Sequence, residues 1–69
     1  MTRYVFTDFY GCEANLTEYD DGTARCIVYN NRGVIFHDKF YKSFRGARIA
    51  IGKMSDGTMK LITRKEVHA

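Results

Sequence analysis

The 69-residue sequence contains no proline and no tryptophan, and its only cysteines are Cys12 and Cys26. Two cysteines are too few for a disulfide framework, so we expect two reduced thiols that pack as small apolar groups. No run approaches the roughly 18 apolar residues that a membrane span needs. The first residues show no signal-peptide pattern, and we therefore expect a cytoplasmic protein without a membrane partner.

The length predicts one small domain, residues 1–69, with a thin core. Five Phe and five Tyr partly offset the small size, since each ring buries on the order of 150–250 Å². A ligand pocket of roughly 300–1,000 Å³ would compete with this core for the same side chains, which argues against an enzyme. A homodimer would relieve the shortage of core and is an alternative.

Turn residues divide the chain at short intervals. The turns are expected at Tyr10-Gly11, Asp20-Asp21-Gly22, Asn30-Asn31-Arg32-Gly33 and Ser55-Asp56-Gly57. Between them lie runs of β-branched and aromatic residues, which predict strands at 3–9, 13–19, 23–29, 34–40 and 58–63. The pair 13–19 and 23–29 is the clearest hairpin, because its alternation and its turn chemistry agree. The polar residues 64–69 are expected to be loose.

The segment 43–54 has a helical period instead. Its apolar side chains share one arc of about 120°, and they are Phe44, Ala47, Ala50, Ile51 and Met54. Ser43 is placed to cap the first turn. Gly46 and Gly52 indicate either close packing against a sheet or fraying. The whole pattern predicts an α+β fold, an antiparallel β-meander with one amphipathic helix packed on it, in the order β-β-β-β-α-β.

Charge is distributed unevenly along the chain, which carries a formal net charge of +3. Residues 1–36 hold three Arg and five acidic residues, whereas residues 37–69 hold eight Lys or Arg and three acidic residues. Such an asymmetry indicates a polarised surface and an anionic partner.

The outer face of the predicted helix is the first candidate site. Arg45, Ile49 and Lys53 cluster opposite the apolar arc, with Arg48 at its edge. An apolar residue ringed by cations is a reasonable contact for a partner protein. With the adjoining last strand, the candidate partner-binding residues are Arg45, Arg48, Ile49, Lys53, Lys60 and Arg64. The competing interpretation is that single exposed apolar residues are common and that Lys53 merely favours the helix dipole.

Direct binding of RNA or single-stranded DNA is the alternative function. The basic carboxyl half supplies eight cations, Lys39, Lys42, Arg45, Arg48, Lys53, Lys60, Arg64 and Lys65. Tyr4, Tyr29 or Tyr41 would then stack on bases. Against this alternative, the sequence has no RNP-like motif, no KH-type GxxG loop, no zinc-finger spacing and no helix-turn-helix pair.

Catalytic and metal-binding interpretations are weaker. Cys12, Cys26, His37 and His68 lack the spacings of zinc sites, and we expect no cofactor. His37 and Asp38 are neighbours on a predicted strand, so their side chains should point to opposite faces. Ser43 is expected to be a helix cap and not a nucleophile. The acidic hairpin residues Glu13, Glu18, Asp20 and Asp21 are explained by turn chemistry.

These observations favour a non-catalytic protein of the binding or inhibitor type that docks through the helix face onto an acidic partner protein. Its size suits an accessory protein of a phage or mobile element, acting on nucleic-acid-handling machinery. A second alternative is a structural subunit that self-assembles through a sheet edge, since no proline blocks the edges. Lys60, Arg64 and Lys65 would guard one edge by charge.

Overall fold

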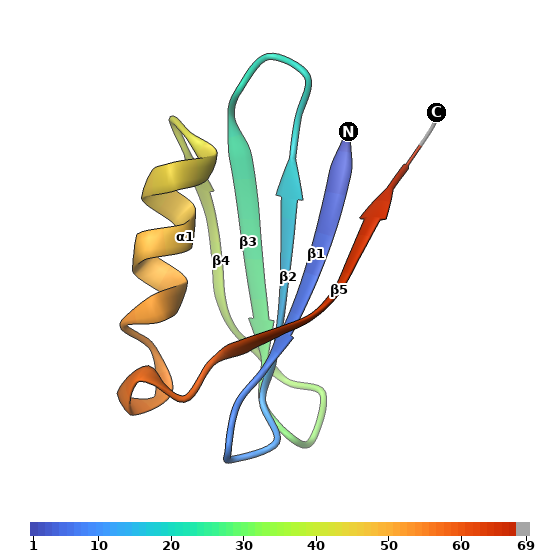
Figure 1. The fold of residues 1–69 in the computed structure, drawn as a ribbon. Coiled ribbons are helices and arrows are strands. Elements are labelled where there is room, and N and C mark those ends of the chain that lie inside the picture. Colours follow the sequence, from blue (N-terminus) through green and yellow to red (C-terminus); the bar gives the residue numbers. More distant parts are fainter. Residues whose placement is uncertain (68–69) are drawn as a thin grey trace.

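The computed structural model describes residues 1–67 and contains one antiparallel sheet with a helix on one face (Figure 1). The strands are β1 (Thr2–Thr7), β2 (Glu13–Glu18), β3 (Ala24–Tyr29), β4 (Ile35–Tyr41) and β5 (Lys60–Glu66). Between β4 and β5 lie α1 (Phe44–Gly52) and the short 3₁₀ helix η1 (Ser55–Gly57). The predicted α+β fold and its element order are confirmed.

The first four strands form three successive hairpins, and β5 returns to the far side of β1. The sheet order is therefore β4-β3-β2-β1-β5, with β4 and β5 at the edges. Gly22 and Gly33 close the second and third hairpins at φ values of 90° and 79°, a region that glycine enters without steric cost. The turn positions that the sequence indicates are thus the actual points of chain reversal.

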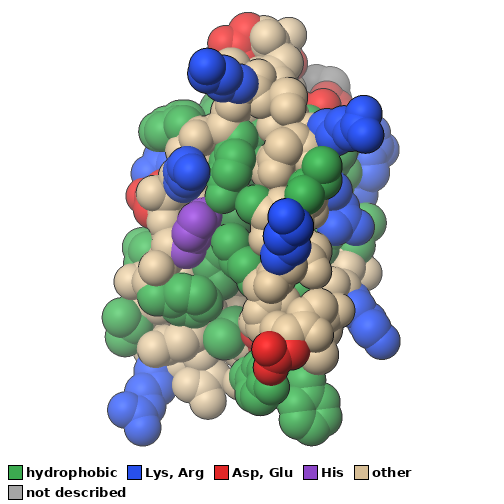
Figure 2. Space-filling view, turned by 90° about the vertical axis from the view of Figure 1, so that its left-hand side faces the viewer, with side chains coloured by type: hydrophobic (Ala, Val, Ile, Leu, Met, Phe, Trp, Pro, Cys, Tyr) green, Lys and Arg blue, Asp and Glu red, His purple; other side chains and the backbone are tan. Residues whose placement is uncertain are grey.

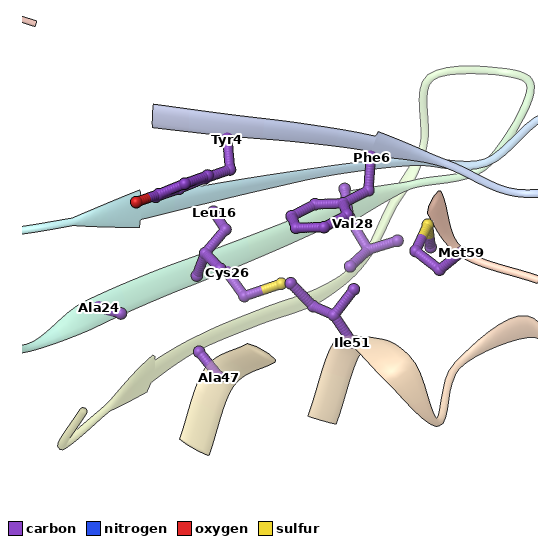
Figure 3. Close-up of a cluster of buried hydrophobic side chains, with 10 residues drawn as sticks. Tyr4, Phe6, Leu16, Ala24, Cys26, Val28, Ala47, Ile51 and Met59 are labelled. Carbon is purple, nitrogen blue, oxygen red and sulfur yellow. The ribbon is translucent and has the colours of Figure 1, made fainter. Parts of the chain in front are cut away.

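Alternate residues of the central strands face α1 and form the core (Figure 3). The register places Phe6 opposite Ala14 and Leu16 opposite Cys26, so these side chains share one face. The buried apolar set is Tyr4, Phe6, Ala14, Leu16, Ala24, Cys26, Val28, Ala47, Ile51 and Met59. Burial of such side chains contributes about 1.5–3 kcal/mol for each large one, and it fixes which face of the sheet is wet.

Helix α1 lies over β2, β3 and β4 and begins as the sequence predicts. The Ser43 hydroxyl oxygen accepts a hydrogen bond from the Gly46 amide at 3.1 Å. Close packing does not explain the glycines, however. A Cβ on Gly46 would meet the capping Ser43 hydroxyl, and a Cβ on Gly52 would meet no atom within 4 Å.

Two boundary predictions are wrong in ways that affect the surface, and α1 also ends at Gly52, before the predicted residue 54. Strand β1 ends at Thr7, so Phe9 lies in the loop that follows and is 84% exposed. Strand β5 extends to Glu66, and the Val67 amide donates to the Met1 carbonyl at 2.8 Å, so residues 64–66 are not loose. This polar segment is ordered because the free edge of β1 pairs with its backbone, which side-chain pattern does not reveal. Residues 68–69, with His68, lie outside the described residues.

Candidate partner-binding surface

The outward side of α1 carries an apolar residue between cations. Arg45, Ile49 and Lys53 follow one another at four-residue intervals and are all exposed, with Ile49 at 50%. The helix sequence contains no acidic residue. Within residues 1–67, neither Arg45 nor Lys53 forms an ion pair. We refer to Arg45, Ile49 and Lys53 as the α1 ridge. Figure 2, which views the molecule from the α1 and β4 side, shows basic side chains interspersed with hydrophobic ones.

Arg48 is not on the ridge. Its side chain reaches across the sheet to β1, where its Cζ atom lies 4.6 Å from the centroid of the buried Phe6 ring. Arg64 on β5 lies in the same way over Tyr4, at 5.8 Å. The Tyr4 hydroxyl, followed by the charges of Glu66 and Glu18, raises the pKa of Arg64. Both guanidinium groups are thus held on aromatic rings on the helix side of the sheet.

Lys60 lies on the opposite face of the sheet from the other residues that were predicted to bind a partner. Its register partner on β1 is Thr7, whose side chain points away from α1, whereas Arg64 pairs with Tyr4 on the helix side. The structure therefore brings Arg45, Arg48, Ile49, Lys53 and Arg64 to one side of the sheet. It places Lys60 on the other side.

The tyrosines proposed for base stacking differ in their availability. Tyr4 is buried, and its ring lies 4.8 Å from that of Phe44. Tyr41 is half-buried, with its hydroxyl 3.0 Å from His37 Nε2. Tyr29 is half-buried on the face away from α1, where it lines a hollow of about 250 Å³ together with Arg3. Tyr4 is thus removed from any stacking role.

The His37 and Asp38 side chains point to opposite faces, as the sequence predicts. Asp38 makes two hydrogen bonds with the Arg25 guanidinium, at 2.9 and 2.8 Å, and these lower the pKa of Asp38. His37 instead meets Tyr41. The two residues therefore cannot act together as a base and its orienting group.

Neither thiol is activated. Burial raises the pKa of Cys26 to about 11, with a further contribution from the charge of Asp38. Desolvation, followed by a hydrogen bond to Asp8, raises the pKa of Cys12. Cys12 precedes β2, and Cys26 faces Leu16 in the register, so the two cysteines are not opposite each other. Over residues 1–67, no group of three His, Cys, Asp or Glu side chains has the arrangement of a metal site.

The acidic hairpin residues have structural partners. Asp21 accepts from the Thr23 amide at 3.0 Å and from the Thr23 hydroxyl at 2.6 Å, which closes the turn. Asp20 pairs with the amino terminus at 3.0 Å, and Glu18 accepts from the Tyr4 hydroxyl at 3.1 Å. These contacts agree with the turn interpretation of the hairpin.

Sequence reasoning missed two exposed apolar groups. One lies on and beside the edge strand β4 and consists of Val34, Ile35, Phe36 and Phe40. The other contains Phe9 in the β1–β2 loop and Ile62 on β5. Their signal in the sequence is indirect. The side chains on β4 and β5 are exposed because these strands are the sheet edges, which follows from strand order, whereas Phe9 and Val34 are exposed because they lie in loops.

In the part of the chain that the structure describes, the longest helix has nine residues, and none is long and apolar enough to cross a membrane. Comparison of the chain with protein-family models, with curated proteins and with solved structures gave no match.

Proposed function

We propose that this chain is a non-catalytic binding protein that docks through the α1 ridge onto an acidic surface of a partner protein. The observation that carries the proposal is the exposed Ile49 side chain between Arg45 and Lys53, on a helix without acidic residues. An apolar centre with a polar rim is the usual composition of a protein interface.

The two kinds of residue on the ridge have separate tasks. Burial of the Ile49 side chain supplies affinity, on the order of 1.5–3 kcal/mol for complete burial. Arg45 and Lys53 supply long-range attraction, which accelerates the encounter with an acidic surface and selects against basic ones. Arg48 and Arg64 extend the cationic area toward β1. Their stacking on Phe6 and Tyr4 restricts the guanidinium groups before binding, which lowers the entropy lost on association.

Nucleic acid is the less favoured partner for this surface. A surface that binds single-stranded nucleic acid uses stacking rings as well as cations, and on the helix side Tyr4 is buried and Tyr41 is half-buried. Ile49 has no function in phosphate binding. An accessory or inhibitory protein that occupies the acidic surface of nucleic-acid-handling machinery satisfies the same geometry.

Affinity capture from an extract of the native host cells tests the proposal. Wild-type chain, Ile49→Asp and Val34→Asp serve as three baits, and mass spectrometry quantifies the retained proteins. Val34 is a matched control, because it is an exposed apolar residue in the β3–β4 connection, away from α1. An acidic protein that wild type and Val34→Asp retain and Ile49→Asp loses supports the proposal. Equal retention by all three baits contradicts it.

Binding to oligonucleotides tests the alternative. Fluorescence anisotropy with short single- and double-stranded DNA and RNA, at low and at physiological salt, separates the two functions. Affinity that falls steeply with salt, for all sequences alike and without dependence on Ile49, would identify a phosphate-binding surface. The docking proposal predicts no such binding at physiological salt.

Self-association is a second candidate that one observation favours. The two sheet edges differ in degree: β5 carries three cations, Lys60, Arg64 and Lys65, beside the exposed Leu61 and Ile62, whereas β4 exposes Ile35, Phe36 and Phe40 and carries one lysine, Lys39. Charged edges resist pairing with other strands and apolar edges do not. We infer that any self-association uses β4. Sedimentation velocity over a range of concentrations tests this inference, with Phe36→Lys as the disrupting variant. A monomer at every concentration excludes self-association, and an oligomer that persists in Phe36→Lys contradicts the assignment to β4.

A further inference from the structure

The sheet face that points away from α1, the open face, carries a row of cations on neighbouring strands. The register places Lys65 on β5 opposite Arg3 on β1. Thr17 on β2 is opposite Arg3 on one side and opposite Arg25 on the other. Residues directly opposite each other in antiparallel strands have their side chains on the same face. The two edges of β1 and β2 thus bring three positive side chains into one row.

These cations differ in whether the sheet supplies a counterion. Asp38 makes two hydrogen bonds with the Arg25 guanidinium, at 2.9 and 2.8 Å. The same guanidinium covers the Phe40 ring, with 5.1 Å between its Cζ atom and the ring centroid. Within residues 1–67, neither Arg3 nor Lys65 forms an ion pair. Like charges directly opposite each other destabilise a sheet, so this pair is more favourable when an anion lies on it.

The carboxylates in the vicinity are directed elsewhere or lie at a distance. Glu18 and Glu66 belong to the helix side of the sheet in the register. Asp20 pairs with the amino terminus at 3.0 Å. Glu13 is on the open face, but it is four residues from Thr17 along β2, about 13 Å at the rise of a strand. The charge next to the unpaired cations on the open face is therefore of one sign.

A hollow of about 250 Å³ extends from these cations along the open face. The described residues that line it are Arg3, Asn15, Thr17, Ile27 and Tyr29, and Arg3 is the one charged residue among them. Arg3 and Thr17 form one end, and the opposed Asn15 and Ile27 form the middle. Tyr29 follows Ile27 by two residues on β3 and forms the other end. We refer to these five residues as the open-face hollow.

The open-face hollow combines two kinds of binding group. A guanidinium beside an ammonium group suits an oxyanion such as a phosphate ester, since Arg donates through a planar fork and Lys adds a compact charge. The Tyr29 ring and the Ile27 side chain suit a planar ring. Tyr29 lines a neighbouring hollow as well, so its half-buried ring remains accessible. Because the two ends are apart along the strands, a spacer has to join the planar ring of a ligand to its oxyanion.

We propose that the open-face hollow binds a nucleoside monophosphate, with the phosphate on Arg3 and Lys65 and the base on Tyr29. The site takes one nucleotide and not a strand, because Tyr29 is the one aromatic residue among the described lining residues and the Arg25 guanidinium covers the Phe40 ring. The hollow and α1 are on opposite faces of the sheet. The proposal therefore does not rest on the proposed function.

Three small probes separate the contribution of the ring from that of the oxyanion. ¹H–¹⁵N correlation spectra of the ¹⁵N-labelled chain are recorded during titration with adenosine 5′-monophosphate, with adenosine and with ribose 5-phosphate. We expect the largest shifts with the nucleotide, at the amides of Arg3, Thr17, Ile27 and Tyr29. Adenosine and ribose 5-phosphate should each bind at least about threefold more weakly, since each lacks one of the two contacts.

A tetra-adenylate distinguishes a free nucleotide from a strand. It should bind at most about fivefold more tightly than the mononucleotide, because it only offers several copies of the same group. A gain of about tenfold or more would overturn the assignment to a mononucleotide. Absence of shifts with adenosine 5′-monophosphate, or an affinity no higher than that of adenosine or of ribose 5-phosphate, would overturn the site itself.

Variants assign the binding to named side chains. The double variant Arg3→Gln, Lys65→Gln should remove the preference for the nucleotide over adenosine, and Tyr29→Leu should remove the preference over ribose 5-phosphate. Lys39→Gln is the matched control, because Lys39 is an exposed lysine on the other edge strand and on the helix side. It should bind the nucleotide as the wild type does. Unchanged preferences in the first two variants, with spectra that show them folded, would overturn the proposal.

Discussion

The guanidinium group of Arg48 covers the ring of Phe6, with 4.6 Å between the Arg48 Cζ atom and the ring centroid. Phe6 is fully buried and belongs to β1, a strand that α1 does not cover closely. The side chain of an exposed helical residue thus closes the core where the helix itself does not reach. Long basic side chains commonly cover apolar surface in this way while their charge stays in water.

Replacement of Arg48 should therefore reduce stability more than replacement of Arg45. Arg48→Ala uncovers the Phe6 ring and loses the cation–π contact, and we expect a loss of about 0.5–2 kcal/mol in the free energy of unfolding. Arg45→Ala, on the α1 ridge, should change it by less than about 0.5 kcal/mol. Urea denaturation followed by circular dichroism measures both. Equal effects of the two variants would show that Arg48 does not close the core.

Acid should destabilise the fold through Asp38. Hydrogen bonds from Arg25 lower the pKa of Asp38 from its ordinary value of 3.8. A carboxyl group with a lowered pKa contributes stability above its unfolded-state pKa, and the contribution is lost as the pH falls through its folded-state pKa. We expect the free energy of unfolding to fall between about pH 5 and pH 2, and Asp38→Asn to show a smaller fall.

The control for this measurement is Glu13→Gln. The Glu13 carboxylate accepts a hydrogen bond from the side-chain Nδ2 of Asn15 at 3.0 Å and not from a cation. The Glu13→Gln variant should retain the pH dependence of the wild type. An Asp38→Asn variant with the wild-type slope would show that the Arg25–Asp38 contact does not stabilise the sheet.

Gly52 in α1 and Gly57 in η1 should respond to alanine in opposite ways. Gly52 has open space around its missing Cβ and a φ that other residues adopt, so Gly52→Ala should raise stability by about 0.5–1 kcal/mol. Gly57 has a φ of 78°, so Gly57→Ala should lower stability by about 1 kcal/mol or more. Thermal unfolding of the two variants measures the signs. Stabilisation by Gly57→Ala would contradict the conformation of η1.

The cysteines should differ in reactivity. Burial raises the pKa of Cys26 to about 11, so near pH 8 only about one molecule in a thousand carries its thiolate. Cys12 is half-buried and more accessible. Iodoacetamide labelling of the folded chain, followed by mass spectrometry of peptides, should modify Cys12 first. Faster labelling of Cys26 would show that β3 separates readily from its neighbouring strands or that the Cys26 side chain is not fully buried.

The hairpins were predictable because local signals agree. In β2 and β3, alternation places Leu16 and Cys26 on one face, and Asp21 and Gly22 supply the turn between them. The helix was predictable for the same reason, since Ser43 marks its start and Ala47 and Ile51 mark its buried side. In these segments, short-range preference and burial favour one structure.

Other features depend on contacts that no local pattern contains. Phe9 continues the apolar pattern of β1, yet Asp8 accepts from the amides of Tyr10 and Cys12 and ends the strand. The pairing of β5 with β1 sets the side of the sheet on which Lys60 lies. The bulge between Val5 and Phe6 shifts that register, and the sequence gives no sign of it. The part of the candidate surface that lies on α1 was thus predictable from the sequence. The positions of Lys60 and Arg64 relative to it, which depend on the pairing of β5 with β1, were not.

The most direct test of the central claim is the dissociation constant between the chain and the acidic protein that it captures. Isothermal titration calorimetry compares wild type with Ile49→Asp and Val34→Asp. We predict that Ile49→Asp weakens binding by about 10-fold or more, the loss expected from an apolar side chain buried in the interface, and that Val34→Asp stays within about twofold of wild type. Equal affinities for wild type and Ile49→Asp would show that the partner does not dock on the α1 ridge.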